Sequence, residues 1–487
     1  MEEAELAPPL PDDALAAVLR RLPPCSIAAS RCVCKAWRDV VDAHGLLLPR
    51  AVRGIYLNFI NYRCPRFIAR PSSERPGTHG NLGFLPRYSR SLGSILDHCN
   101  GLLLYDGGFM REFYVVNPAT RRWKCLPPRM GLLDYVAYLV FDPAVSPHYE
   151  VVLMPRVPEK PVPIAEKYAP PPSPVNLARL FSLLDDELDV EDTDEEDSRE
   201  EPVGWPPHSR SIEEGFFSAC RFMPASSEPE DPYVSMEWPP SPYTFHVFSS
   251  CTGCWEKRSF VREGEAVGTV EDVRLDSWPA HWGPRRRYGV YWRGALYVHC
   301  RGAFVMRLSL TNSTYQVIKT PTNGEESHHT RFYLGRSEKG VYLAAVQNYS
   351  QLQIWILDES CGQVEWVSRH HNDLDPYVSR AAVDSDYHER IDGPWILEDE
   401  DSEYTHIDFL GFHPYKEIIF LMASFIGIAY HLNTSRVQYL GKLRPDDYDY
   451  TQAAGVYESF LYTPCMTGDL PETKHENHSG DSKSCQS

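Results

Sequence analysis

From about residue 52 onward, short runs of Val, Ile, Leu, Tyr and Phe alternate with turns rich in Gly, Pro, Asn and Asp. Runs of roughly four to eight such residues between turn formers are typical of strands. The 28 Tyr and 11 Trp of the chain also favour pleated, half-buried surfaces. The pattern therefore predicts a mainly β domain over residues 52–463, built as a sandwich, a barrel or a propeller. Representative runs are FYVVNPAT (113–120), YGVYWRGALYVHC (288–300) and LQIWILD (352–358).

A loose internal repeat favours the propeller. In each copy a strand ends in a polar turn, and an aromatic or apolar strand resumes a few residues later. The copies are VVNPATRRWKCLPP (115–128), RLSLTNSTYQVIKTP (307–321), ILDESCGQVEWVS (356–368) and YHLNTSRVQYLGKL (430–443). A four-stranded blade takes about 40–50 residues, so the domain has room for about seven blades, and six to eight fit the length.

Three segments are predicted to be disordered. Residues 155–215 form an insert that begins with prolines and continues into the acidic run 185–201, and neither part can bury enough apolar surface to order itself. The lead, 1–9, and the polar tail, 464–487, are predicted to be disordered as well.

Charge and hydropathy limit the kinds of partner and compartment. The formal net charge is −19, but the run 185–201 contributes twelve acidic residues and one arginine, so the rest of the chain is only mildly acidic. This mild negative charge argues against nucleic-acid and membrane partners. The acidic N-terminus does not resemble a secretory signal, and the most apolar stretch, 418–432, is too short for a spanning helix. It is better explained by two buried strands joined near Ser424. The 13 cysteines are predicted to be free thiols in an intracellular protein, in cytoplasm or nucleus.

Residues 10–50 are predicted to be helical. In LPDDALAAVLRRL the apolar residues Leu15, Val18, Leu19 and Leu22 fall on one helix face. Pro11 suits the helix start, and Pro23-Pro24 ends the helix. A second helical stretch follows. The unit is too small to bury a large core of its own, so we expect it to be stabilised by packing against a partner or a neighbouring domain.

The segment LPDDALAAVLRRLPPCSIAASRCVCKAWRDVV resembles an F-box, because LPDD, RLP and VCKxWR occur in the order and at the spacing of that family. The resemblance implies a three-helix module at 10–50 that docks on the Skp1 adaptor and, through it, on a cullin. The positions that it implies for adaptor contacts or for the module's small core are Leu10, Pro11, Leu15, Val18, Leu19, Leu22, Pro23, Ile27, Val33 and Trp37.

The β region is similar to plant F-box-associated domains. The similarity rests on CNGLLLY…FYVVNPATRRWKCLPP, WRGALYV (292–298) and LQIWILDESCGQVEWV (352–367). It implies a kelch-like propeller that presents a protein substrate, although most of the usual Gly-Gly doublets are missing.

Other motifs favour structural roles. Cys251-x-x-Cys254 lacks a second ligand pair and sits at a predicted hairpin turn. The pairs His328-His329 and His370-His371 lack the framing carboxylates of a metal site, although His371-x-Asp373 is a weak exception. Four tryptophans are expected to pack between blades rather than stack on a ligand, namely Trp123, Trp292, Trp355 and Trp366. We therefore expect no metal, no cofactor and no catalytic residue.

The leading hypothesis is a non-catalytic substrate receptor of an SCF (Skp1–cullin–F-box) ubiquitin ligase, which binds a protein target of unknown identity. One alternative is an adaptor-independent interaction scaffold built on the propeller. Another is a propeller hydrolase with paired carboxylates, for which the sequence identifies no pair. The residues that contact the substrate cannot be named from the sequence.

Overall fold

The computed structural model describes residues 10–22, 24–44, 46, 52–60, 62, 64–69, 80–86, 88, 93–108, 112–128, 135–158, 231–274, 288–321, 331–337, 339–347, 350–360, 364–374, 407–445, 448, 455–466 and 470. The chain divides into two compact units, one formed by 1–157 and 236–487 and the other by 158–235. In the second unit, only Pro158 and residues 231–235 are described. The predicted lead, 1–9, and all of the predicted insert after Pro158 lie outside the described residues.

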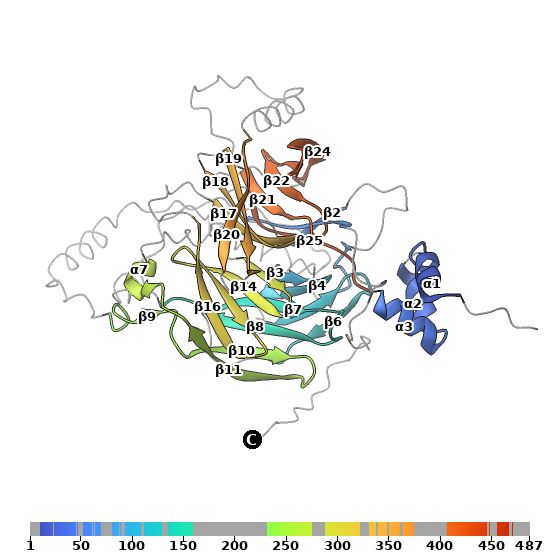
Figure 1. Ribbon diagram of the computed structural model, residues 1–487, viewed down its shortest axis with the longest axis horizontal. Coiled ribbons are helices and arrows are strands. Elements are labelled where there is room, and N and C mark those ends of the chain that lie inside the picture. Colours follow the sequence, from blue (N-terminus) through green and yellow to red (C-terminus); the bar gives the residue numbers. More distant parts are fainter. Residues whose placement is uncertain are drawn as a thin grey trace, which may run out of the picture. The chain divides into compact units, whose positions relative to one another are not determined.

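Three short helices open the described chain, as the sequence predicts (Figure 1). They are α1 (Asp12–Leu19), α2 (Pro24–Arg31) and α3 (Lys35–Ala43). Pro11 precedes α1, and two aspartates occupy its first turn, where the helix dipole favours negative charge. The helices enclose a small core of buried apolar side chains: Ala16, Leu19, Ile27, Val40, Val41 and Leu46.

Five antiparallel groups of four strands follow, each forming one propeller blade (Figure 1). The first blade contains β3 (Ser94–Cys99), β4 (Leu102–Asp106), β5 (Phe113–Asn117) and β6 (Arg122–Cys125). The second contains β7 (Tyr135–Phe141), β8 (Tyr149–Pro155), β10 (Tyr243–Ser249) and β11 (Cys254–Glu263). The third contains β13 (Gly289–Trp292), β14 (Ala295–Cys300), β15 (Phe304–Ser309) and β16 (Thr314–Lys319).

The fourth and fifth blades have the same form. The fourth contains β17 (Arg331–Ser337), β18 (Gly340–Gln347), β19 (Gln351–Asp358) and β20 (Glu365–Asp373). The fifth contains β21 (Ile407–Phe412), β22 (Ile418–Ala423), β23 (Ile426–His431) and β24 (Arg436–Lys442). The second and third blades also join into one eight-stranded sheet, because the outer strands β11 and β16 pair in parallel at Val261↔Thr314.

The sixth blade combines the two ends of the β region. Strand β25 (Val456–Tyr462) pairs antiparallel with β1 (Gly54–Phe59), which in turn pairs with β2 (Arg66–Ala69). The side chain of Asn58 on β1 also donates to the carbonyl of Ile95 on β3, at 2.8 Å, and so ties this blade to the first. The chain therefore closes its own ring with strands that lie about 400 residues apart in the sequence.

The hydrophobic cores confirm the count of six blades. Six large clusters of buried apolar side chains lie one between each pair of neighbouring blades, including one between the sixth blade and the first. The sequence-based range of six to eight thus contains the observed number, while the length estimate of seven is too high by one. That estimate spread the residues evenly over the blades, whereas segments such as 375–406 connect blades without adding a described strand.

The repeat in the sequence marks one position in the blades. Each of its four copies spans the turn from the third strand to the fourth, and SSCTGCW (249–255) is an unrecognised fifth copy in the second blade. Where the turn is fully described, the residue before the fourth strand has a positive φ: Arg121, Gly253, Ser313 and Ser435. The stretch 418–432 forms two strands joined at Ser424 and Phe425, as predicted.

The tail prediction needs a correction at its start. Cys465 is fully buried and Leu470 is 2% exposed, although both fall in the segment predicted to be disordered from 464. The carbonyl of Cys465 accepts a hydrogen bond from Asn117 at 3.0 Å, and that of Leu470 accepts one from Arg122 at 3.3 Å. The sequence-based prediction missed these two residues because the rest of the tail is polar. Both pack in the core between the first and second blades.

A two-stranded ribbon and one short helix complete the described fold. The short strands β9 (Glu237–Trp238) and β12 (Gly268–Thr269) pair with each other, and helix α7 (Val270–Arg274) follows β12. Val270 and Val273 of α7 pack in the core between the second and third blades.

Candidate functional site

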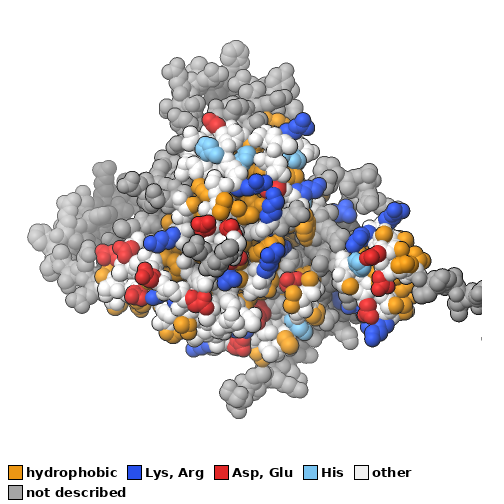
Figure 2. All heavy atoms as spheres, in the orientation of Figure 1, with side chains coloured by type: hydrophobic (Ala, Val, Ile, Leu, Met, Phe, Trp, Pro, Cys, Tyr) orange, Lys and Arg blue, Asp and Glu red, His pale blue; other side chains and the backbone are white. Residues whose placement is uncertain are grey.

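The helical module carries large apolar side chains that its own core does not cover. Leu10 is 61% exposed, Val18 54%, Leu22 38% and Val33 65%. Figure 2 shows apolar side chains gathered along one margin of this module. Val18 lies in the last turn of α1, and Leu22 lies in the tight turn that follows the helix. We refer to Leu10, Val18, Leu22 and Val33 as the apolar patch.

The structure separates the predicted site residues into two groups. Leu19 and Ile27 are buried in the module's core, and Leu15 and Trp37 pack against that core. The members of the apolar patch and Pro11 are exposed instead. Pro23 lies outside the described residues. The helical spacing alone could not make this separation, because it placed Val18 and Leu19 on one stripe although only one of them is buried.

Polar contacts hold α1 against the end of α3. The guanidinium of Arg20 donates to Nδ1 of His44 at 3.5 Å, and Nε2 of His44 lies 3.7 Å from a carboxylate oxygen of Asp13. These contacts are exposed, so each contributes little to stability.

Residues 9–48 match the F-box domain. The match covers the three helices and the apolar patch, and it agrees closely with the predicted boundaries of 10–50. The F-box of this chain is therefore a three-helix module whose buried residues form its core and whose apolar patch is open to a partner.

The remaining comparisons concern the fold. No curated protein matches the chain. The solved structures to which the chain shows similarity include YCF48 bound to D1 peptide (8% identity, TM-score 0.31, 80% of this chain and 82% of that chain covered). A prolyl endopeptidase structure is 8% identical, with a TM-score of 0.30 and coverage of 88% and 54%. A GH43 protein from Bacillus licheniformis is 9% identical, with a TM-score of 0.25 and coverage of 79% and 58%.

A second candidate site is a cavity of about 80 Å³ on the axis of the propeller, which we call the central cavity. Its lining includes residues of β3, β7, β13, β17, β21 and β25. Each blade thus contributes its innermost strand. The space is small, and it suits a few waters or one small polar group.

Buried polar groups stabilise the wall of the central cavity. Asp97 is 7% exposed, and its carboxylate accepts the backbone N–H of His98 at 2.8 Å and that of Leu139 at 2.7 Å. One oxygen therefore bonds within β3, and the other joins β3 to β7. Glu458, which is 6% exposed, contributes a second carboxylate from β25. The sequence pattern did not identify these residues, because each lies inside an ordinary strand run.

His98 gives the propeller a defined sensitivity to acid. Its Nδ1 atom is buried without a hydrogen-bond partner, and burial together with the charge of Arg336 lowers the pKa of His98 to about 4. The unfolded chain binds this proton near pH 6.5, so stability falls as pH drops from about 6.5 to 4, by up to about 3 kcal/mol.

We expect the variant His98→Gln to lose less stability than the wild type over the same pH range. Urea unfolding at pH 7 and pH 5 measures the difference. Equal losses in the two proteins would contradict the assignment. His148→Gln is a suitable control, because His148 lies on the exposed turn between β7 and β8.

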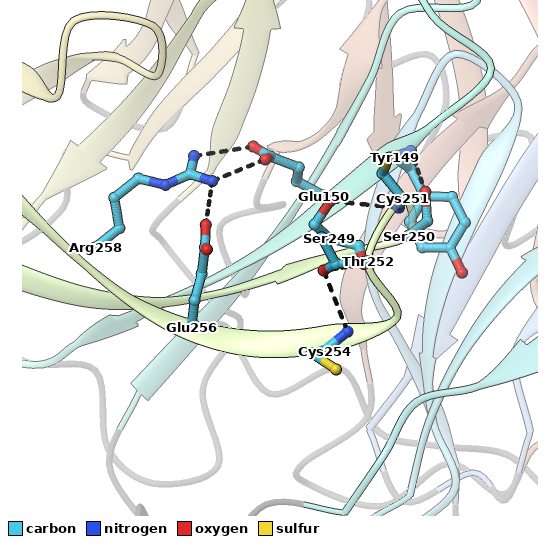
Figure 3. A network of polar contacts seen from close by, with 9 residues as sticks. All are labelled: Tyr149, Glu150, Ser249, Ser250, Cys251, Thr252, Cys254, Glu256 and Arg258. Carbon is cyan, nitrogen blue, oxygen red and sulfur yellow. Dashed lines mark hydrogen bonds and ion pairs between the residues drawn. The ribbon is translucent and has the colours of Figure 1, made fainter. Parts of the chain in front are cut away.

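The Cys251-x-x-Cys254 motif lies on the hairpin from β10 to β11, as predicted (Figure 3). Both cysteines are exposed and free, and the backbone N–H groups of this turn bond to Ser249 and Thr252. Farther along the hairpin, Arg258 bonds to Glu150 on β8 and to Glu256. Within the described residues, no group of three or more His, Cys, Asp or Glu side chains is placed to hold a metal ion.

The structure describes only one of the two histidine pairs. His328 and His329 lie outside the described residues. His370 and His371 lie on β20. There, His370 is half-buried and lies 2.9 Å from the hydroxyl of Tyr430, while His371 is exposed. Neighbouring residues on a strand face opposite sides, so the two rings do not share a ligand.

The four tryptophans contribute to packing. Trp355 is buried, and Trp123, Trp292 and Trp366 pack against the cores between blades. The indole of Trp366 also donates from the fourth blade to the carbonyl of Lys319 in the third, at 3.0 Å. The described part of the chain holds no helix that is both long and apolar enough to cross a membrane.

Proposed function

We propose that this protein is the substrate-recognition subunit of an SCF-type ubiquitin ligase. In this proposal the F-box binds a Skp1 adaptor, and through it a cullin, while the propeller recruits a protein target inside the cell. F-box proteins are typically non-catalytic, and the subunit would act by bringing the target close to the ubiquitin-carrying enzyme.

The observation that carries the proposal is the exposed apolar patch on a matched F-box. Burying one Leu or Val side chain contributes roughly 1.5–3 kcal/mol. Four such side chains therefore supply an energy of the same order as the roughly 8 kcal/mol of a micromolar complex, before the costs of association. A module that left these side chains in water would gain nothing from them.

The propeller supplies the second half of the proposed function. A closed ring of six blades is a rigid platform, and its connecting segments are free to vary without disturbing the cores. We assign it to the kelch-like F-box-associated domains of plant proteins on the strength of the strand and turn motifs quoted above. The identity of the target is not encoded in these shared motifs.

The direct test is complex formation between the full-length chain and a purified Skp1-type adaptor, followed by size-exclusion chromatography with light scattering. We expect a stable complex, which incorporates a cullin when purified cullin is added. Absence of the complex, with a propeller that still unfolds cooperatively, would refute the proposal and favour an adaptor-independent scaffold.

A further inference from the structure

Two arginines from neighbouring blades lie over the same tryptophan. The guanidinium carbon of Arg293 is 5.2 Å from the ring centroid of Trp292, and that of Arg336 is 6.0 Å away. Trp292 and Arg293 end β13 and begin its turn, whereas Arg336 lies near the end of β17. Each contact attracts a cation to the same indole ring.

Neither arginine is neutralised by a carboxylate within the described residues. Arg336 donates to the amide oxygen of Asn100, a neutral acceptor, and Arg293 contacts only the indole. Three other arginines of the propeller are paired with glutamates at 2.8–3.0 Å, namely Arg258, Arg262 and Arg307. Within the described residues, two arginines on one indole ring and without an acidic partner leave positive charge available for a negative group.

The position of Arg336 connects this pair to the central cavity. Arg336 lines the cavity together with Asn100 and Tyr291. The cavity also contains the carboxylates of Asp97 and Glu458, but Asp97 is already engaged by two backbone N–H groups. The volume of about 80 Å³ admits the head of one side chain. These features favour a small oxyanion on the side of the cavity where Arg336 lies.

We propose that Arg293, Trp292 and Arg336 form an anion site that receives an oxyanion of the target protein, either a carboxylate or a phosphorylated side chain. This inference rests on the proposed function for the idea that the propeller recruits a protein. Arginine suits the role because its planar fork can bond two oxygens of one acidic group while its face remains stacked on the indole.

The test measures peptide binding by the full-length protein without any adaptor, so that a failure here is distinct from a failure of the F-box. The probes are a fluorescein-labelled Gly-Ser peptide with a central run of glutamates, its glutamine twin and its phosphoserine twin. We expect the glutamate or the phosphoserine peptide to bind, the glutamine twin not to bind, and added salt to weaken binding.

Variants then locate the site. Arg293→Gln with Arg336→Gln is expected to weaken binding by about tenfold or more, while the paired Arg→Lys variant retains part of it. Arg436→Gln is the matched control, since Arg436 is exposed on the outer strand β24. Which peptide binds identifies the source of the oxyanion. Binding of the glutamine twin, equal binding by the double variant, or no binding of any peptide would each overturn the proposal.

Discussion

Replacing Val18 and Leu22 together by aspartate is expected to weaken the binding of a Skp1-type adaptor by at least about 100-fold. Both side chains are exposed members of the apolar patch, so the F-box should still fold. A carboxylate at either position would lose the apolar contact and would also have to be desolvated in the interface, and each effect costs about 1–3 kcal/mol. Titration by biolayer interferometry measures the change.

The control for this experiment is Val145→Asp. Val145 is 81% exposed on the turn between β7 and β8, so the substitution makes the same chemical change outside the F-box. We expect adaptor binding by this variant to match the wild type. Leu19→Asp is a poor substitute for the patch variants, because Leu19 is 1% exposed and its loss would unfold the module. Unchanged binding by the Val18→Asp/Leu22→Asp variant would show that the adaptor does not use this surface.

Deleting residues 455–487 is expected to abolish cooperative folding of the propeller. The deletion removes β25, which pairs with β1 and contributes a buried side chain at Val456, Phe460, Leu461 and Tyr462. Truncating one large core side chain costs roughly 2–5 kcal/mol. Four such losses sum to about 8–20 kcal/mol, which is comparable to the 5–15 kcal/mol that stabilises a typical domain.

Calorimetry and limited proteolysis of the truncated chain measure this effect. The matched control ends at Leu470 and lacks only residues 471–487, so it keeps every described contact of β25, Cys465 and Leu470. We expect its melting temperature to stay within a few degrees of the wild type. If the longer deletion melted like the control, the ring would not depend on closure by β25.

The sequence by itself determined the features that rest on local patterns. Helical spacing and the LPDD, RLP and VCKxWR motifs identified the F-box, and the family match at residues 9–48 agrees. Strand alternation identified the β domain, and turn residues such as Asn117 and Ser424 marked hairpins that the structure contains. These predictions succeed because a turn or an amphipathic helix depends mainly on residues within a few positions of one another.

Only the tertiary structure decided the features that depend on distant residues. It fixed the number of blades, because the sixth blade exists only where β25 meets β1. It separated Val18 from Leu19, since burial depends on how α2 and α3 pack against α1. It also brought Arg336 on β17 to Trp292 on β13, although no local pattern links the two positions. The physical reason is the same in each case: pairing and packing energies arise between segments that the chain brings together only on folding.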